Sequence, residues 1–109
     1  MISYEDFTKV EIRVGKVIRA EEFPKARKPA YKLWIDFGTF GVKKSSAQIT
    51  KLYQCEELVG RLVVAVTNLP PRQIANFQSE VLVLGLATED ESVTLLSPDH
   101  PVPLGNKVF

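Results

Sequence analysis

Residues 10–18 read VEIRVGKVI, and this stretch decides the fold. Its apolar positions alternate with charged ones as far as Val14, which is the pattern of a strand with one buried face. Gly15 interrupts the alternation before it resumes at Val17, and a glycine at such a point indicates a bulge. A first strand that is long and bent favours a small closed barrel over a sandwich of two sheets.

The rest of the chain carries further strand patterns and little helical signal. Residues 31–37 repeat the alternation, whereas 62–66 and 81–86 are continuous runs rich in Val and Leu, as expected of strands covered on both sides or at the tight core of a barrel. Only residues 50–53 and 56–59 suggest helix, and the second ends at a glycine that stops it. We therefore expect an all-β fold, a small barrel with one or two short helices.

Length and composition restrict the class of protein. A chain of 109 residues leaves room for one domain, covering residues 1–109. Its single cysteine, Cys55, has no partner for a disulfide or a metal site, which suits a reducing cytoplasm. Glu5 and Asp6 precede any apolar run, and residues 62–66 are too few to cross a bilayer. We expect a cytoplasmic location, no signal peptide and no membrane insertion.

Catalytic patterns are missing from the sequence. The only histidine, His100, lies among prolines in a loop and has no nucleophile in a recognisable context. The phosphate-binding GxxxxGK[ST] motif and the HExxH and CxxC metal motifs are absent. We therefore expect a protein that is not an enzyme and that uses no metal or cofactor.

Positive charge is concentrated between Pro24 and Lys51. Seven of the 14 basic residues lie in this segment with Asp36 as the only acid, so its net charge is +6, while the rest of the chain is −5. Such a field attracts an anionic or extended partner to one face of a molecule. Solvation is the simplest reason for a charge run, but aromatic residues, including Tyr31 and Trp34, lie among these bases.

We predict a binding face made of these basic and aromatic residues. Trp34 shares the polar side of its strand with Lys32, so it meets a ligand or a second subunit, unless barrel curvature buries both faces. A second element, residues 68–79, contains the Pro70-Pro71 pair and, near its end, Asn76 and Phe77. These two residues either contact a ligand or form a turn and its hydrophobic plug. The candidate site residues are Arg27, Lys28, Tyr31, Lys32, Trp34, Lys43, Lys44, Ser45, Ser46, Gln48, Arg72, Asn76, Phe77 and Ser79. This combination suits single-stranded nucleic acid and extended peptide equally well.

Five blocks of the sequence carry a family resemblance. They read DFTKVEIRVGKV at 6–17, FPKARKPAYKL at 23–33, SSAQIT at 45–50, LVGR at 58–61 and SEVLVLG at 79–85. Together they resemble the tRNA-binding-domain superfamily, and its CsaA branch in particular.

The resemblance implies an OB-fold barrel that forms a homodimer through its terminal segments, here residues 2–7 and 102–109. It also implies an export-related, chaperone-like activity that binds unfolded or precursor polypeptides without ATP and is linked to the Sec translocase ATPase. Other members of the superfamily bind tRNA, so a tRNA-binding protein that uses the same face is the alternative. Those members commonly have a His-Pro pair followed by Ala-Asp, where this chain has Phe23-Pro24 and Ala26-Arg27.

Overall fold

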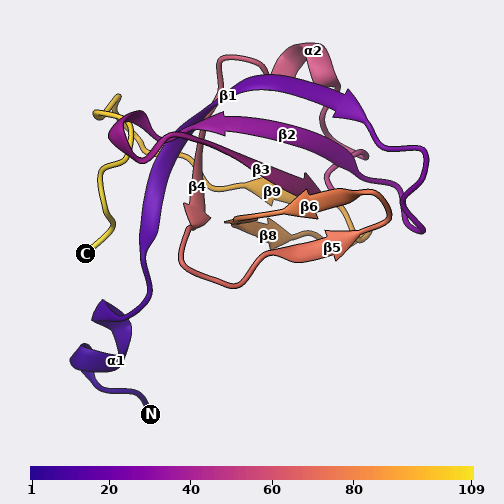
Figure 1. Ribbon diagram of the computed structural model, residues 1–109. Coiled ribbons are helices and arrows are strands. Elements are labelled where there is room, and N and C mark those ends of the chain that lie inside the picture. Colours follow the sequence, from indigo (N-terminus) through magenta and orange to yellow (C-terminus); the bar gives the residue numbers. More distant parts are fainter.

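The computed structural model describes residues 1–109 and confirms an almost all-β, nearly closed barrel with two short α-helices (Figure 1). Five antiparallel strands form the barrel sheet in the order β3-β2-β1-β4-β7. Their bounds are Ile12–Glu22 for β1, Tyr31–Asp36 for β2, Val42–Ala47 for β3, Leu62–Val66 for β4 and Leu82–Val83 for β7. Two hairpins complete the β-structure: β5 (Arg72–Ile74) with β6 (Phe77–Ser79), and β8 (Gly85–Ala87) with β9 (Val93–Leu95).

The helices are α1 (Tyr4–Thr8), α2 (Cys55–Leu58) and a single 3-10 turn, η1 (Gly38–Phe40). The longest of them has five residues, so none is long and apolar enough to cross a membrane. The predicted helix over residues 56–59 is confirmed as α2. It begins after Gln54, whose N–H donates to the Glu57 carboxylate, and it ends before Gly60, which takes a φ of 93°. The helical signal at residues 50–53 was wrong, because residues 50–52 form a turn and none of the four is helical.

The core lies on the inner face of β2, where the predicted alternation is confirmed. Tyr31, Leu33, Ile35 and Phe37 are all buried, and the residues between them are half-buried on the outer face. The buried side chains of β1, β4 and α2 pack against this row. Burial of such side chains is the main source of folding free energy in a domain of this size.

The bend in β1 is confirmed, but its bulge lies at a different residue from the one predicted. The pairing of β1 with β2 shifts by one residue between Val17 and Arg19, so Ile18 is the extra residue and is exposed. Beyond the bulge Arg19 lies directly opposite Trp34 on the outer face. An extra residue reverses which side chains face outward, and this shift is what brings Arg19 to the outer face.

Gly15 is required by close packing and not by a bulge. It pairs regularly with Val63 of β4. A Cβ atom at this position would lie 2.5 Å from Cγ2 of Ile35 and 2.7 Å from Cε1 of Phe37, closer than carbon atoms approach. The absence of a side chain therefore allows β1 to fold tightly over the core row of β2.

The prediction of one covered strand over residues 81–86 was wrong. The chain leaves the barrel sheet after β7 and pairs with β9 as β8. Leu82 and Leu86 are 52% and 60% exposed, so neither is covered on both sides. An unbroken run of apolar residues does not indicate that its first part pairs in one sheet and its last part in another.

The N-terminal helix α1 stands away from the barrel and buries none of its residues (Figure 1). Its start is a capping box: the Asp6 N–H donates to Ser3 Oγ, and the Ser3 N–H donates to the Asp6 carboxylate, both at 3.1 Å. Because a helix of this length is marginal by itself, we attribute its presence to the cap and to the network that holds its C-terminal end.

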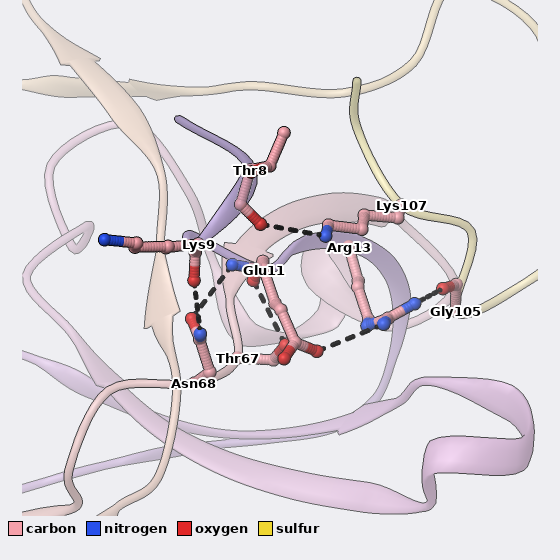
Figure 2. A network of polar contacts seen from close by, with 8 residues as sticks. All are labelled: Thr8, Lys9, Glu11, Arg13, Thr67, Asn68, Gly105 and Lys107. Carbon is pink, nitrogen blue, oxygen red and sulfur yellow. Dashed lines mark hydrogen bonds and ion pairs between the residues drawn. The ribbon is translucent and has the colours of Figure 1, made fainter. Parts of the chain in front are cut away.

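A polar network fixes the junction of α1 with β1, the β4–β5 loop and the C-terminal segment (Figure 2). Asn68 accepts a hydrogen bond from the Glu11 N–H at 2.9 Å and donates one to the Lys9 carbonyl at 2.7 Å. Arg13 donates through Nη1 to the Gly105 carbonyl at 2.8 Å. The loop that leads into β5 is thus held by side-chain hydrogen bonds on the start of β1.

The C-terminal segment lies along the edge of β1 that β4 does not occupy. The Gly105 N–H donates to the Val14 carbonyl at 2.8 Å, and the Val108 N–H donates to the Ile12 carbonyl at 2.7 Å. These bonds satisfy backbone groups that the barrel sheet leaves open at this end of the strand.

Candidate functional site

A groove with a volume of about 1060 Å³ opens between the β1–β2 loop, the end of β3, β5 and β7. Its floor is apolar and includes Ile49, Val81, Val83 and Leu95. Leu82 stands at its border and is exposed. A concave apolar surface of this extent is suited to burying side chains of a ligand.

Four basic side chains border the groove, and we call them the basic rim. Lys25, Arg27 and Lys28 come from the β1–β2 loop, and Arg72 comes from β5. All four are exposed, and none forms an ion pair within the chain. The single acid at the groove, Glu80, accepts a hydrogen bond from the Lys44 N–H. The surroundings of the groove are therefore positively charged.

Beside the groove an aromatic cluster of Phe23, Trp34 and Phe77 covers the outer face of β2. The Phe77 ring meets the Phe23 ring at 5.5 Å and the Trp34 ring at 5.8 Å between centroids, both edge to face. Phe23 and Phe77 are buried, and Trp34 is half-buried. Phe77 thus acts as the hydrophobic plug that was one of the two interpretations of this residue, and it seats the β5–β6 hairpin on the barrel.

Cationic side chains surround the aromatic cluster. The Arg19 guanidinium lies 4.5 Å from the Trp34 centroid and also pairs with Glu21. Lys32 and Lys44 place their ammonium groups 5.7 Å and 5.2 Å from the Phe77 centroid. Cations at these distances from ring faces are attracted by the ring quadrupole, so the cluster holds positive charge at the surface.

The free edge of β3 is closed by residues 79–81. The Ser46 N–H donates to Ser79 Oγ at 3.0 Å, and Ser45 Oγ donates to the Val81 carbonyl at 2.8 Å. Ser45 is only 1% exposed, so its hydroxyl belongs to the closure of the barrel. Tyr31 is likewise part of the core, where its hydroxyl donates to the Tyr53 carbonyl at 2.8 Å.

The structure divides the predicted site residues into five groups. Arg27, Lys28, Ser46, Gln48, Arg72 and Ser79 line the groove. Lys32, Trp34, Lys44 and Phe77 belong to the outer-face cluster or lie against it. Asn76 is exposed in the hairpin loop, Lys43 is half-buried on β3, and Tyr31 and Ser45 face the interior.

Sequence reasoning missed several residues of the site. Lys25 had a signal, because it lies in the basic run, whereas Arg19 had none, because its orientation depends on the bulge at Ile18. Phe23 and Ile74 were missed because nothing local shows that the β5–β6 hairpin folds over the barrel.

The thiol of Cys55 is not an activated group. Burial raises its pKa, and the negative charges of Glu56 and Glu22 raise it further. A thiol with a raised pKa is poorly nucleophilic at neutral pH. No group of three or more His, Cys, Asp or Glu residues is placed to hold a metal ion.

Comparison with known proteins identifies relatives of two kinds. Residues 12–107 match the family model described as a putative tRNA binding domain, a binding module and not a catalytic one. The methionine–tRNA ligase of Nanoarchaeum equitans is 38% identical over 110 residues, which cover 99% of this chain. The chain spans only 14% of the length of that ligase.

Solved structures of two chaperones are similar over their whole length. The chaperone CsaA from Bacillus anthracis has a TM-score of 0.95 and 51% identity, and the match covers 100% of this chain and 99% of that one. The CsaA chaperone protein from Picrophilus torridus has a TM-score of 0.93 and 54% identity, with 100% of both chains covered. The sequence resemblance to the tRNA-binding-domain superfamily and its CsaA branch is thereby confirmed.

Proposed function

This chain belongs to the family of putative tRNA-binding domains, and from that premise we propose that it binds extended, non-native polypeptides as a chaperone-like protein. We further propose that its clients include precursors of exported proteins, that it works in the cytoplasm without ATP, and that it hands clients to the Sec translocase ATPase. Full-length similarity to two CsaA chaperones supports the first part of this proposal.

The observation that carries the proposal is the apolar floor of the groove. An unfolded polypeptide offers apolar side chains that a native protein hides, and burying one side chain the size of Leu stabilises a complex by roughly 1.5–3 kcal/mol. Exposed Leu82 and the half-buried Val83 and Ile74 provide the complementary surface, and the core residues Val81 and Leu95 close the floor. A few such contacts, reduced by the entropy lost on association, give reversible binding.

The basic rim contributes encounter rate and selectivity. Four unpaired cations beside one acid attract acidic or flexible segments, and the attraction weakens with salt. Arg27, Lys28 and Arg72 are the site residues to which we assign this role. Gln48, at the end of β3, is placed to exchange hydrogen bonds with a backbone in the groove.

The second candidate function is tRNA binding on the same side of the molecule. It is favoured by the family match and by the half-buried Trp34 ring beside Arg19, since an aromatic ring next to a cation stacks on a nucleic-acid base. Phe23 and Phe77 are buried, so Trp34 alone of the cluster offers a ring to a base.

We also propose that the protein is a homodimer through its terminal segments. Ile2, Tyr4 and Phe109 are largely or fully exposed, and α1 has no buried residue. Covering these side chains with a second copy would remove an apolar surface that is costly to leave in water.

A salt titration of charge-reversal variants separates the two ligands. RNA binding releases counterions, so log affinity for bulk tRNA should fall with log salt with a slope near −0.7 for each single-strand phosphate contacted. Affinity for a permanently unfolded, carboxymethylated protein should depend weakly on salt. Arg27→Glu with Lys28→Glu should nearly abolish tRNA binding and mainly slow association of the unfolded protein. Lys9→Glu with Lys16→Glu is the control, because it changes net charge equally away from the groove.

If the carboxymethylated protein does not bind at any salt concentration of the titration, the chaperone-like function is refuted. If the Arg27 and Lys28 variant loses both ligands equally and Trp34→Ala weakens tRNA binding, tRNA binding becomes the better-supported function.

A further inference from the structure

The β5–β6 hairpin has one strand edge without a partner. β6 lies next to β3, and β5 pairs only with β6, so the other edge of β5 is open. Arg72, Gln73 and Ile74, which make up β5, all line the groove. An open strand edge inside a groove is a place where another chain can add as a strand.

The available backbone groups on this edge belong to Gln73. Ile74 and Phe77 face each other across a two-residue loop, so they form a hydrogen-bonded pair, and the next pair, Gln73 with Gln78, is a non-hydrogen-bonded one. The N–H and C=O of Gln73 therefore point away from β6. Neither group takes part in any backbone hydrogen bond outside the hairpin or in any side-chain hydrogen bond.

The open edge is short by construction. Pro70 and Pro71 precede β5 and have no N–H to donate, so the edge cannot extend toward the N-terminus. At the other end the Ala75 carbonyl is occupied by the side-chain amide of Gln73 at 3.0 Å. Only one residue of an added strand can form the reciprocal pair of hydrogen bonds with β5.

We propose that an extended polypeptide in the groove adds as a strand to β5, with one of its residues paired to the backbone of Gln73. This inference rests on the proposed function and specifies how the groove holds its ligand. The paired residue donates its N–H to the Gln73 carbonyl and accepts from the Gln73 N–H. Backbone pairing is independent of side chains, which gives a binder of diverse unfolded segments an anchor common to all of them.

Strand alternation then determines what the neighbouring residues contact. The paired residue points to the same face as Gln73, which is exposed, and its two neighbours point to the face of Arg72 and Ile74. That is the face on which Phe77 meets the barrel. The two neighbours are therefore apolar side chains that reach the groove floor, and an acidic residue just beyond them meets Arg72 or the β1–β2 loop. The favoured ligand is an extended segment with apolar residues at alternate positions and an adjacent acid.

The test uses a synthetic peptide of about nine residues that is rich in Ser and carries one Leu-Ser-Leu unit followed by Asp. Methylating the backbone nitrogen of the Ser between the two Leu residues removes the donor to Gln73 and should weaken binding about tenfold or more. Methylating the nitrogen of the following Leu, which points away from β5, should change binding less than about threefold.

Protein variants provide a matched pair at the same position. Gln73→Pro removes the N–H from the open edge without breaking a backbone hydrogen bond of the hairpin, and should weaken binding of the unmodified peptide about tenfold. The side-chain bond from Gln73 to the Ala75 carbonyl is lost in both variants of the pair. Gln73→Ala keeps the backbone and should bind as the parent does. Addition of the peptide should slow hydrogen exchange of the Gln73 amide. The exchange rate of the Ala87 amide should not change, and it serves as the control because Ala87 holds the equivalent outward position in the β8–β9 hairpin.

The outcomes distinguish the binding mode from the function. Peptide binding that is unaffected by the position of the methyl group, with no added protection at Gln73, would overturn strand addition and leave polypeptide binding intact. If neither this peptide nor a carboxymethylated protein binds at all, the proposed function fails and the strand-addition mode is refuted with it.

Discussion

Replacing Phe77 by Ala should detach the β5–β6 hairpin from the barrel and destabilise the whole fold. Phe77 is 7% exposed, and its ring forms edge-to-face contacts with Phe23 and Trp34. Truncating a buried Phe to Ala typically costs about 3–5 kcal/mol. For a chain of this size that cost should lower the midpoint of thermal unfolding by roughly 10–20 °C.

The control is Phe77→Leu, which retains most of the apolar volume and removes the aromatic contacts. Two edge-to-face pairs at about 0.5–1.5 kcal/mol each set its expected loss at roughly 1–3 kcal/mol. Unfolding in urea gives both free energies. Trp34 is the only tryptophan, so its fluorescence reports on this cluster alone.

In Phe77→Ala the Trp34 emission of the folded protein should shift to the red as water reaches the ring. The reasoning is refuted if Phe77→Ala costs less than about 1 kcal/mol and leaves the folded-state emission unchanged. In that case the hairpin would be held mainly by the hydrogen bonds of residues 79–81 to β3.

Three further results are expected. Gly15→Ala should destabilise the protein by about 1–3 kcal/mol in urea titrations, because the added methyl group overlaps Ile35 and Phe37, whereas an unchanged midpoint would show that β1 can move. Burial raises the pKa of Tyr31 above its ordinary value of 10.0, so its contribution to stability is complete below about pH 10 and is lost at higher pH. Tyr31→Phe should flatten this alkaline decline, and a parallel decline in both proteins would contradict the assignment. Sedimentation should give about twice the 12.2 kDa mass of one chain, and deleting residues 1–8 should shift the protein toward monomer, while a monomeric parent would disprove the dimer.

Local patterns predicted the parts of the fold that local physics determines. The alternation over residues 31–37 requires one buried face, and β2 has it. The capping box between Ser3 and Asp6 was also present in the sequence, and it was overlooked because the acids there were interpreted only as evidence against a signal peptide. The β5–β6 hairpin escaped prediction because its turn has no glycine, and Ala75 instead takes a φ of 49°.

The candidate site was harder to predict because it depends on contacts between distant parts of the chain. The basic run did indicate the β1–β2 loop, which borders the groove. The meeting of Trp34 with Phe77 has no local signal, because it follows from how the hairpin returns to the outer face of β2. Ser45 satisfied the pattern of a polar side chain near the basic loop, but closure of the barrel uses its hydroxyl.

The C-terminal segment along β1 has a consequence for synthesis on the ribosome. Arg13 and its partner Gly105 are 92 residues apart. At a translation rate of about 5–20 residues per second, this edge of β1 therefore stays uncovered for roughly 5–18 s after Arg13 has been added to the chain. During that interval the Val14 and Ile12 backbone groups that bind residues 105–108 are open to other chains. A nascent copy of this protein is therefore itself an unfolded polypeptide with an exposed strand, and slowing translation in its last third should increase aggregation of the newly made chain.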